Sequence, residues 1–318
     1  MKSAVLLIVF NRPEPTGKVF EAIRRARPER LYVAADGPRV DRPGEWRRCE
    51  EVRRLTTNVD WPCQLETLFQ AKNLGCGRGV SSAINWFFEH EDEGIILEDD
   101  CLPAPSFFSY CDAMLERYRD DERIAQVSGS NFIGAKVAKG ASYFFSNYPD
   151  IWGWATWRRS WEHFDVSMAE WPLSKRISNF IKVADGDLLV EAYWRKIFDD
   201  TWRGKIDTWD YQWIFSCWRR GSINIIPAEN LVENLGFGDD ATHTTHSESS
   251  FLQKPGELSF PLVHPVKIEA SREADHLISK LRYGISLYSE IVSKLRRIPI
   301  LSDILKGAKK RVVQLTRG

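Results

Sequence analysis

Short apolar runs alternate with longer stretches of mixed polarity over the first hundred positions of the chain. A run of four to eight apolar residues between polar ones is typical of a strand buried on both faces, and the intervening stretches have the spacing of amphipathic helices. The predicted strands are 4–10, 31–35, 63–69 and 94–97, and the predicted helices are 15–26, 42–56 and 79–90. This alternation predicts an α/β fold, in which helices flank both faces of a mainly parallel sheet.

Beyond residue 140 the alternation weakens and tryptophan becomes frequent. Three tryptophans lie between positions 152 and 157, and two more follow at 209 and 213. The sequence contains neither an internal repeat nor a low-complexity linker. We therefore expect residues 131–275 to elaborate the sheet begun by residues 1–130, so that a single domain covers 1–275.

The last part of the chain has a different pattern. Apolar residues recur at intervals of three and four, at 277, 281, 285, 288, 292 and 295, which predicts an amphipathic helical tail over 276–318. Residues 277–318 hold ten Lys or Arg and two acids, a net charge of +8. Such a tail is suited to an anionic membrane surface, although an apolar stripe of this kind more commonly packs on its own domain or on a second copy in a homodimer.

Composition narrows the class of protein. The chain has 318 residues, 43% of them hydrophobic and 28% charged, which is a globular composition. Its 44 basic and 44 acidic residues cancel, which argues against a nucleic-acid-binding protein. No apolar run reaches the roughly 18 residues of a membrane-spanning helix, and no secretory signal is recognisable. The six cysteines form no CxxC pair, so we expect reduced thiols in a cytoplasmic protein.

Polar residues follow each predicted strand of the first half. In parallel sheets, ligands bind at the carboxyl ends of the strands, where these residues would meet. The candidate ligand-binding residues are Asn11, Arg12, Asp36, Asn73, Gly75 and the triplet Glu98-Asp99-Asp100.

The acid triplet is the strongest single signal. Like charges a few ångströms apart raise one another's pKa unless a cation compensates, and a hard divalent metal is the usual compensation. The alternative is a solvated acidic turn. The preceding buried strand and the helix predicted from Pro103 onward favour the metal site.

The segment Glu98-Asp-Asp-Cys-Leu-Pro-Ala-Pro-Ser-Phe-Phe-Ser-Tyr110 resembles the metal-binding segment of GT-A fold glycosyltransferases in the N-acetylglucosaminyltransferase I group and their bacterial relatives. Three further matches follow in the same order along the chain. They are Asp150-Ile-Trp-Gly-Trp-Ala-Thr-Trp157, Trp209-Asp-Tyr-Gln-Trp213 and the segment 227–238, which ends in Gly236-Phe-Gly238. The resemblance covers roughly residues 3–245 and is far more specific than one acidic triplet.

The resemblance implies a GT-A fold and a set of residue roles. Asp100 would ligate Mn²⁺ or Mg²⁺ bound to the diphosphate of a sugar nucleotide, and Asp99 would lie near the ribose or the donor sugar. Asp36 would accept a hydrogen bond from the base, uracil being the first expectation, and Asp210 would act as general base. The residues that would line the nucleotide pocket are Phe10, Asn11 and Arg12.

The residues around Asp210 give an independent reason to expect a general base at this position. Activation of a sugar hydroxyl needs a carboxylate within hydrogen-bond reach, in a partly apolar environment such as Trp209 and Trp213 would supply. Asp207 and Glu233 are the competing carboxylates. A helix N-cap is the alternative role for Asp210, because Asp is a favoured capping residue.

The tryptophan-rich segment and a later loop supply weaker candidates. One of Trp152, Trp154 and Trp157 is expected to face the ligand, with Trp154 chosen, although an aromatic stripe more commonly fills a core. Asp150 is expected to bind hydroxyls of the donor sugar. His243 is a candidate second metal ligand, with an ordinary surface histidine as the alternative.

Together these features predict a metal-dependent, inverting glycosyltransferase. It would move a sugar from a nucleoside diphosphate sugar to a hydroxyl of a glycan or lipid-linked glycan, with nucleotide binding in 1–130 and acceptor binding in 131–275. A peripheral position at the inner face of the cytoplasmic membrane would suit the basic tail. The alternatives are a nucleotidyltransferase that makes sugar nucleotides, although residues 11–16 are not its Gly-rich loop, and a non-catalytic glycan-binding protein, which would be expected to lose the acids.

Overall fold

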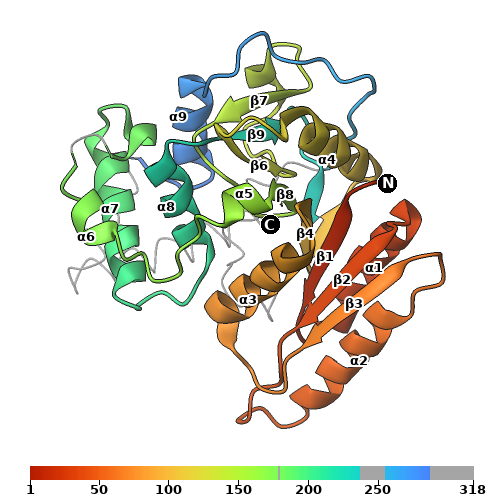
Figure 1. The fold of residues 1–318 in the computed structure, drawn as a ribbon. Helices are drawn as coiled ribbons and strands as arrows, with labels where there is room; N and C mark the ends of the chain where they lie inside the picture. Colours follow the sequence, from red (N-terminus) through yellow and green to blue (C-terminus); the bar gives the residue numbers. More distant parts are fainter. Residues whose placement is uncertain (178–179, 237–254, 287–318) are drawn as a thin grey trace, which may run out of the picture.

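A single central sheet organises the chain in the computed structural model, which describes residues 1–177, 180–236 and 255–286 (Figure 1). Its strands are β1 Ala4–Val9, β2 Arg30–Ala35, β3 Gln64–Phe69, β4 Glu93–Glu98, β6 Ile124–Ser128, β7 Tyr143–Ser146, β8 Trp154–Trp157 and β9 Ile223–Pro227. They are arranged in the order β3-β2-β1-β4-β8-β6-β9-β7. Strands of the second half therefore extend the sheet that the first half begins.

The sheet is mainly parallel. β3, β2, β1 and β4 pair in parallel, as do β6 and β9. β8 is inserted antiparallel between β4 and β6, and β7 pairs antiparallel with β9 at the edge. The α/β fold predicted from the sequence is confirmed.

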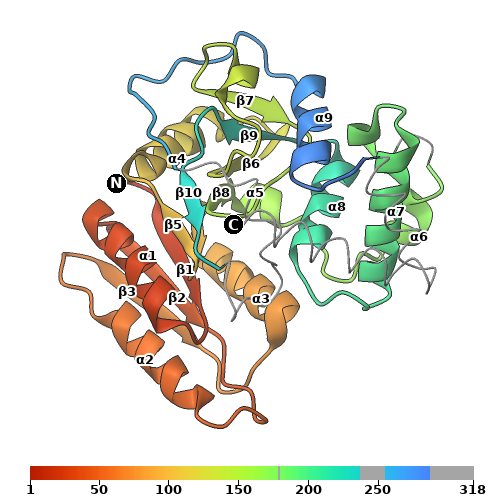
Figure 2. The same ribbon diagram turned by 180° about the vertical axis from the view of Figure 1, so that it is seen from behind.

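Helices cover both faces of the sheet, as the alternating pattern requires. They are α1 Pro13–Ala26, α2 Glu45–Thr57, α3 Gly75–His90, α4 Pro105–Tyr118, α5 Arg158–Trp161, α6 Trp171–Ser174, α7 Leu188–Trp202, α8 Asp210–Arg220 and α9 Arg272–Leu281. Leu6 and Ile8 of β1 belong to the apolar cluster that includes α3, whereas Val5 and Leu7 belong to the cluster of α1, α2 and α4. Figures 1 and 2 show α1 and α2 on the opposite side of the sheet from α3.

A small second sheet ties the late part of the chain to the end of β4. β5 (Cys101–Pro103) pairs antiparallel with β10 (Val232–Asn234), so that Asn234 lies opposite Cys101 (Figure 2). The backbone N–H of Leu235 also donates to the carbonyl oxygen of Asp100 at 2.8 Å. This ladder brings residues 234–236 beside the acid triplet.

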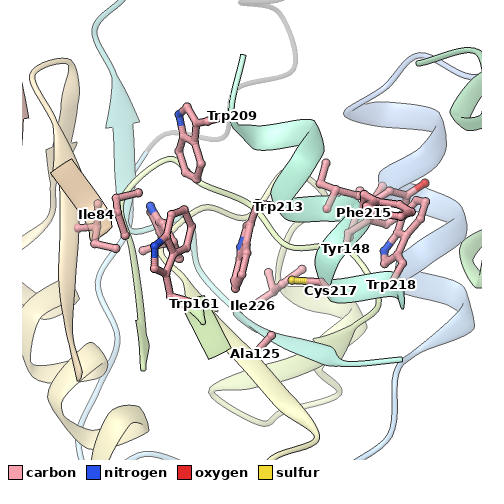
Figure 3. Packing of buried hydrophobic residues seen from close by; sticks show 14 of the residues in the cluster. Ile84, Ala125, Tyr148, Trp161, Trp209, Trp213, Phe215, Cys217, Trp218 and Ile226 are labelled. Atoms are coloured by element: carbon pink, nitrogen blue, oxygen red, sulfur yellow. The ribbon is translucent and has the colours of Figure 1, made fainter. Parts of the chain in front are cut away.

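Tryptophans fill the core beneath α8. The rings of Trp154 and Trp209 stack with their centroids 5.7 Å apart. Trp161 and Trp213 pack beside them, and Figure 3 shows Trp161, Trp209 and Trp213 in this cluster. The indole N–H of Trp213 donates to Gln126 Oε1 at 2.6 Å, which satisfies a polar group inside this cluster. The tryptophan-rich segment is therefore largely a packing element.

Helix α9, the last helix among the described residues, packs on the sheet domain. Ala274 and Ile278 are buried in the core cluster, and the Asp275 carboxylate accepts hydrogen bonds from Ser146 Oγ at 2.6 Å and Asn147 Nδ2 at 2.6 Å. The expected boundary between 275 and 276 thus falls inside a packed helix, which ends at Leu281. The predicted tail from residue 287 onward lies outside the described residues.

Two further observations concern the described ranges. No helix among them combines the length and the hydropathy that crossing a membrane requires. All six cysteines are unpaired, in agreement with the expected reduced thiols.

Candidate active site

The carboxyl ends of β1, β2 and β4 border a pocket of about 800 Å³. This is the edge where parallel sheets bind ligands, and the volume is within the roughly 300–1,000 Å³ of ordinary ligand sites. The sequence-predicted residues that line it are Phe10, Asn11, Arg12, Asp36, Asn73, Gly75, Asp99, Asp100, Asp150 and Asp210. Trp154 is not among its lining residues, and His243 lies outside the described residues.

The acid triplet turns out of β4 into the pocket and meets one arginine. Arg12, which follows β1, donates from Nε to Asp99 Oδ2 at 3.3 Å, and its Nη2 also pairs with Asp99 Oδ1. The same Nη2 lies 3.0 Å from Asp100 Oδ2. β1 and β4 are neighbours in parallel register, with Ile8 opposite Glu98, and this register brings Arg12 to the triplet.

The charges at this edge do not balance. Burial raises the pKa of Glu98 to about 8, and the nearby charges of Asp100 and Asp99 add to the effect. Burial also raises the pKa of Asp99, although Arg12 opposes it. For Arg12, burial alone would lower the pKa, but Asp99 and Asp100 outweigh it and raise the value. Two carboxylates therefore share one guanidinium, and a third carboxyl group lies buried beside them.

This donor set fits a divalent cation that takes most of its ligands from a bound substrate. Among the described residues, no group of three or more His, Cys, Asp or Glu side chains is arranged to hold a metal by itself. Mg²⁺ is commonly bound through one or two carboxylates together with substrate phosphates, and the Asp100 carboxylate, which lines the pocket, supplies oxygen atoms of the required kind. A Cβ at Gly236 would collide with Asp100 Oδ2, so a larger residue there would require the carboxylate to move.

Asp36 holds the loop that leads into α3. Its carboxylate accepts hydrogen bonds from Asn73 Nδ2 at 2.9 Å and from the backbone N–H groups of Leu74 at 2.9 Å and Gly75 at 3.2 Å. Burial raises the pKa of Asp36, and these backbone hydrogen bonds oppose the rise. Gly75 has a φ of +80°, a conformation that favours glycine. Asp36, Asn73 and Gly75 thus build one corner of the pocket together.

Phe10 and Asn11 form the adjoining corner. The Arg39 guanidinium lies over the Phe10 ring, 5.4 Å from its centroid. Asn11 Nδ2 donates to Glu45 Oε1 at 2.8 Å, and Arg39 pairs with the same carboxylate. Burial alone would raise the pKa of Glu45, but its hydrogen bonds with Arg39 lower it. A charged, fixed network therefore supports the aromatic wall of the pocket.

Asp210 is the first residue of α8 and lines the pocket. Its Oδ1 accepts hydrogen bonds from Thr208 Oγ1 and, at 2.9 Å, from the backbone N–H of Tyr211. The carboxylate thus has a local partner at the helix start, and it also faces the pocket. The flanking Trp209 and Trp213 are both buried in the core.

The two competing carboxylates have different surroundings. Asp207 lines the pocket, where its Oδ1 accepts a hydrogen bond from the backbone N–H of Gly77 at 3.3 Å. Glu233 is an exposed residue of β10 and is not a lining residue. Asp207 and Asp210 both line the pocket, and of these two it is Asp207 that accepts a hydrogen bond from the backbone of α3.

The three tryptophans of the 152–157 segment lie in different places. Trp154 is 0% exposed and Trp157 is 2% exposed, and both belong to the core. Trp152 lines the pocket instead. Gly153, with a φ of +62°, turns the chain between Trp152 and β8. The regular alternation of side chains between the two faces of the strand begins only at Trp154, so it does not place Trp152 on the same face as Trp154.

Asp150 lies two residues before Trp152, and one of its neighbours is a residue that the sequence did not suggest. Its Oδ1 accepts the backbone N–H of Trp152 at 3.2 Å, and its Oδ2 lies 3.5 Å from Nε of Arg282. Arg282 and Tyr283 follow α9 and line the pocket. They were assigned to the tail because their neighbours have helical apolar spacing, and no local motif marks either residue as part of a site.

No family model and no curated protein matches this chain. Solved structures with a similar fold include residues 1–349 of TarS from S. aureus, at 12% identity and a TM-score of 0.33, over 50% of this chain and 47% of that one. HddC from Yersinia pseudotuberculosis is 10% identical, with a TM-score of 0.31, over 49% of this chain and 77% of that one.

A UDP-glucose pyrophosphorylase complexed with UDP-glucose is 9% identical, with a TM-score of 0.28, over 51% of this chain and 71% of that one. The chain spans about half the length of the TarS chain. At these identities and scores the similarities concern the fold of about half the chain. They assign neither a family nor an activity, and the resemblance to the N-acetylglucosaminyltransferase I group rests on the motif residues named above.

Proposed function

We propose that this chain is a glycosyltransferase that moves a sugar from a nucleoside diphosphate sugar, a UDP-sugar first of all, to a hydroxyl of a glycan or lipid-linked glycan. The observation that carries the proposal is the meeting of Asp99, Asp100 and Asp210 with Arg12 in one pocket at the carboxyl edge of the sheet. This pocket offers oxygen ligands, a cation and a separate carboxylate to a single substrate.

Each group has a task in such a transfer. The two adjoining corners of the pocket, one with Asp36 and the other with Phe10 and Asn11, would receive the nucleoside, and Arg12 would face the diphosphate. A divalent cation, Mn²⁺ or Mg²⁺, held by Asp100 with Asp99 beside it, would offset the charge of the departing diphosphate.

Asp210 is proposed as the general base. Its carboxylate would accept the proton of the acceptor hydroxyl as that oxygen forms a bond to the anomeric carbon and the nucleoside diphosphate departs. A single displacement of this kind inverts the anomeric centre. Because Asp210 comes from α8 and the acid triplet from β4, base and leaving group would be held by separate elements.

Donor hydrolysis gives the most direct test. The purified protein would be incubated with UDP-, GDP- and dTDP-sugars and Mn²⁺, and release of the nucleoside diphosphate would be measured. We expect slow release from one donor class and its loss on addition of EDTA. Release that is insensitive to saturating EDTA would contradict the role of the metal.

A nucleotidyltransferase would instead produce pyrophosphate from a nucleoside triphosphate and a sugar 1-phosphate. The same samples tested with these substrates distinguish the two reactions. Pyrophosphate formation without donor hydrolysis would contradict the glycosyltransferase proposal.

A further inference from the structure

Arg282 occupies an aromatic enclosure on the pocket wall. Its guanidinium carbon lies 4.3 Å from the ring centroid of Trp152, 4.7 Å from that of Phe132 and 5.8 Å from that of Tyr283. Cation–π contacts of this kind favour a planar guanidinium over an ammonium group. The three rings come from separate segments of the chain, so together they fix the side chain in position.

Arg282 also forms an ion pair with the buried carboxylate of Asp150. Its Nε lies 3.5 Å from Asp150 Oδ2, and the Asp150 side chain is only 10% exposed. Burial raises the pKa of Asp150, and the charge of Arg282 opposes that rise. The second oxygen of Asp150 is held by the backbone N–H of Trp152 at 3.2 Å. The carboxylate is therefore oriented from two sides while it remains on the pocket surface.

The position of Arg282 depends on α9. This helix is fixed to the sheet by Asp275, which accepts hydrogen bonds from Ser146 and Asn147, and by Ser279, whose hydroxyl lies 2.8 Å from Tyr148 Oη. Arg282 follows directly after the last residue of the helix. A segment far from the acid triplet in sequence thus completes the wall of the same pocket.

We propose that Arg282 is a positioning residue that fixes the Asp150 carboxylate as the hydrogen-bond acceptor for a hydroxyl of the transferred sugar. This inference rests on the proposed function. An ionised carboxylate can only accept, so it would select a sugar that presents a hydroxyl toward it. The nucleotide would be bound elsewhere, at Phe10, Asn11 and Asp36, which allows its affinity to be measured separately from that of the sugar.

The test compares affinities for nucleotides with affinities for nucleotide sugars. Dissociation constants would be measured by calorimetry with Mn²⁺ for UDP, UDP-glucose, UDP-N-acetylglucosamine, GDP, GDP-mannose, dTDP and dTDP-glucose. The variants are Arg282→Gln and Arg282→Lys. Arg117→Gln is the matched control, because Arg117 also lies over a ring, 5.6 Å from the centroid of Tyr118, but does not line the pocket.

For Arg282→Gln we expect the affinity for the preferred nucleotide sugar to fall about tenfold, which corresponds to the loss of roughly one charge-assisted hydrogen bond. The affinity for the nucleotide alone should stay within twofold of the wild-type value. Arg282→Lys should recover part of this loss because it restores the charge without the planar stacking. Arg117→Gln should leave both affinities unchanged.

Three results would overturn the inference. The first is that neither affinity changes in Arg282→Gln. The second is an equal loss for nucleotide and nucleotide sugar, which would mean that Arg282 binds the diphosphate or only supports the fold. The third is a wild type in which no sugar adds affinity. Failure of the wild type to bind any of these nucleotides has a different meaning, because it would contradict the proposed function itself.

Discussion

Individual side chains at the pocket were predictable where the residue type and its place after a strand carried the signal. Arg12, Asp36, Asp99 and Asp100 each lie within three residues after an apolar run, and all four line the pocket. Trp154 was not predictable in this way, because a single glycine conformation decides whether it or Trp152 faces outward. Arg282 could not be predicted as a pocket residue, because the sequence around it has the pattern of the end of a packed helix.

The Asp100 carboxylate is expected to support metal-dependent nucleotide binding. In Asp100→Ala, we expect the affinity for UDP in the presence of Mn²⁺ to fall to the level measured with EDTA, because the cation loses its protein ligand. Calorimetry with and without Mn²⁺ would measure this. An Asp100→Ala protein that still gains affinity from Mn²⁺ would show that Asp100 is not a ligand.

The Asp210 carboxylate is expected to act on the acceptor and not on the donor. Asp210→Asn keeps the size of the side chain and removes the base, so transfer should fall by roughly 10²–10⁴-fold while donor affinity is kept. Glu233→Gln is the matched control, because Glu233 is an exposed carboxylate outside the pocket. Near-normal transfer by Asp210→Asn would remove this residue from the mechanism.

Among the elements, strands were predicted more closely than the start of α3. β1, β2 and β4 agree with the apolar runs within one or two residues, because burial on both faces leaves a continuous pattern. α3 was expected from residue 79 but begins at Gly75. Its first turn is glycine-rich and is held by Asp36 and Asp207, which lie far away in sequence. Helix propensity alone gives no sign of such partners.

Loss of Asp36 should loosen this first turn. Asp36→Ala leaves the N–H groups of Leu74 and Gly75 and the Asn73 amide without their acceptor, so we expect the free energy of unfolding to fall by about 1–3 kcal/mol. Urea unfolding would measure the change. Asp36→Asn, which keeps one acceptor oxygen, should lose less, and the exposed Asp41→Ala should lose nothing. Equal stability of Asp36→Ala and wild type would contradict this account.

At the scale of the whole molecule, one sheet joins the two halves of the chain. The sequence predicted this, because no linker separates them, but it did not predict that Arg282 and Tyr283, directly after α9, line the pocket. An amphipathic helix has the same spacing of apolar residues whether it packs on its own domain or on another surface. The spacing alone therefore does not predict which surface the helix contacts. The burial of Ala274 and Ile278 decides it for α9.

Two truncations test this packing. A chain that ends at Ser286 keeps α9 and should unfold with a thermal midpoint close to that of the full protein. A chain that ends at Ser271 exposes the partners of Asp275 and Ser279 and uncovers apolar surface, so its midpoint should fall by several degrees or its cooperative transition should be lost. Circular dichroism would follow both. Equal midpoints for the two truncations would mean that α9 contributes little to stability.

The segment beyond the described residues carries its own prediction. Residues 287–318 contain eight Lys or Arg and two acids. We expect the full chain to sediment with anionic phosphatidylserine vesicles at low salt and to be released at high salt, because each basic residue near such a surface contributes on the order of 1 kcal/mol. The chain that ends at Ser286 is the control. The same sedimentation by both chains would exclude 287–318 as the binding segment.

The start of α3 has a consequence for how the protein would hold an anion. The positive end of a helix dipole, with its free N–H groups, is a common phosphate-binding device in α/β folds. Here the N–H groups of Leu74, Gly75 and Gly77 donate to carboxylates of the protein itself. These donors are already occupied before any ligand arrives. In the proposed reaction the attraction for a diphosphate would therefore come from a side-chain guanidinium and a dissolved cation, so its strength should follow the concentration of divalent ions in the solution.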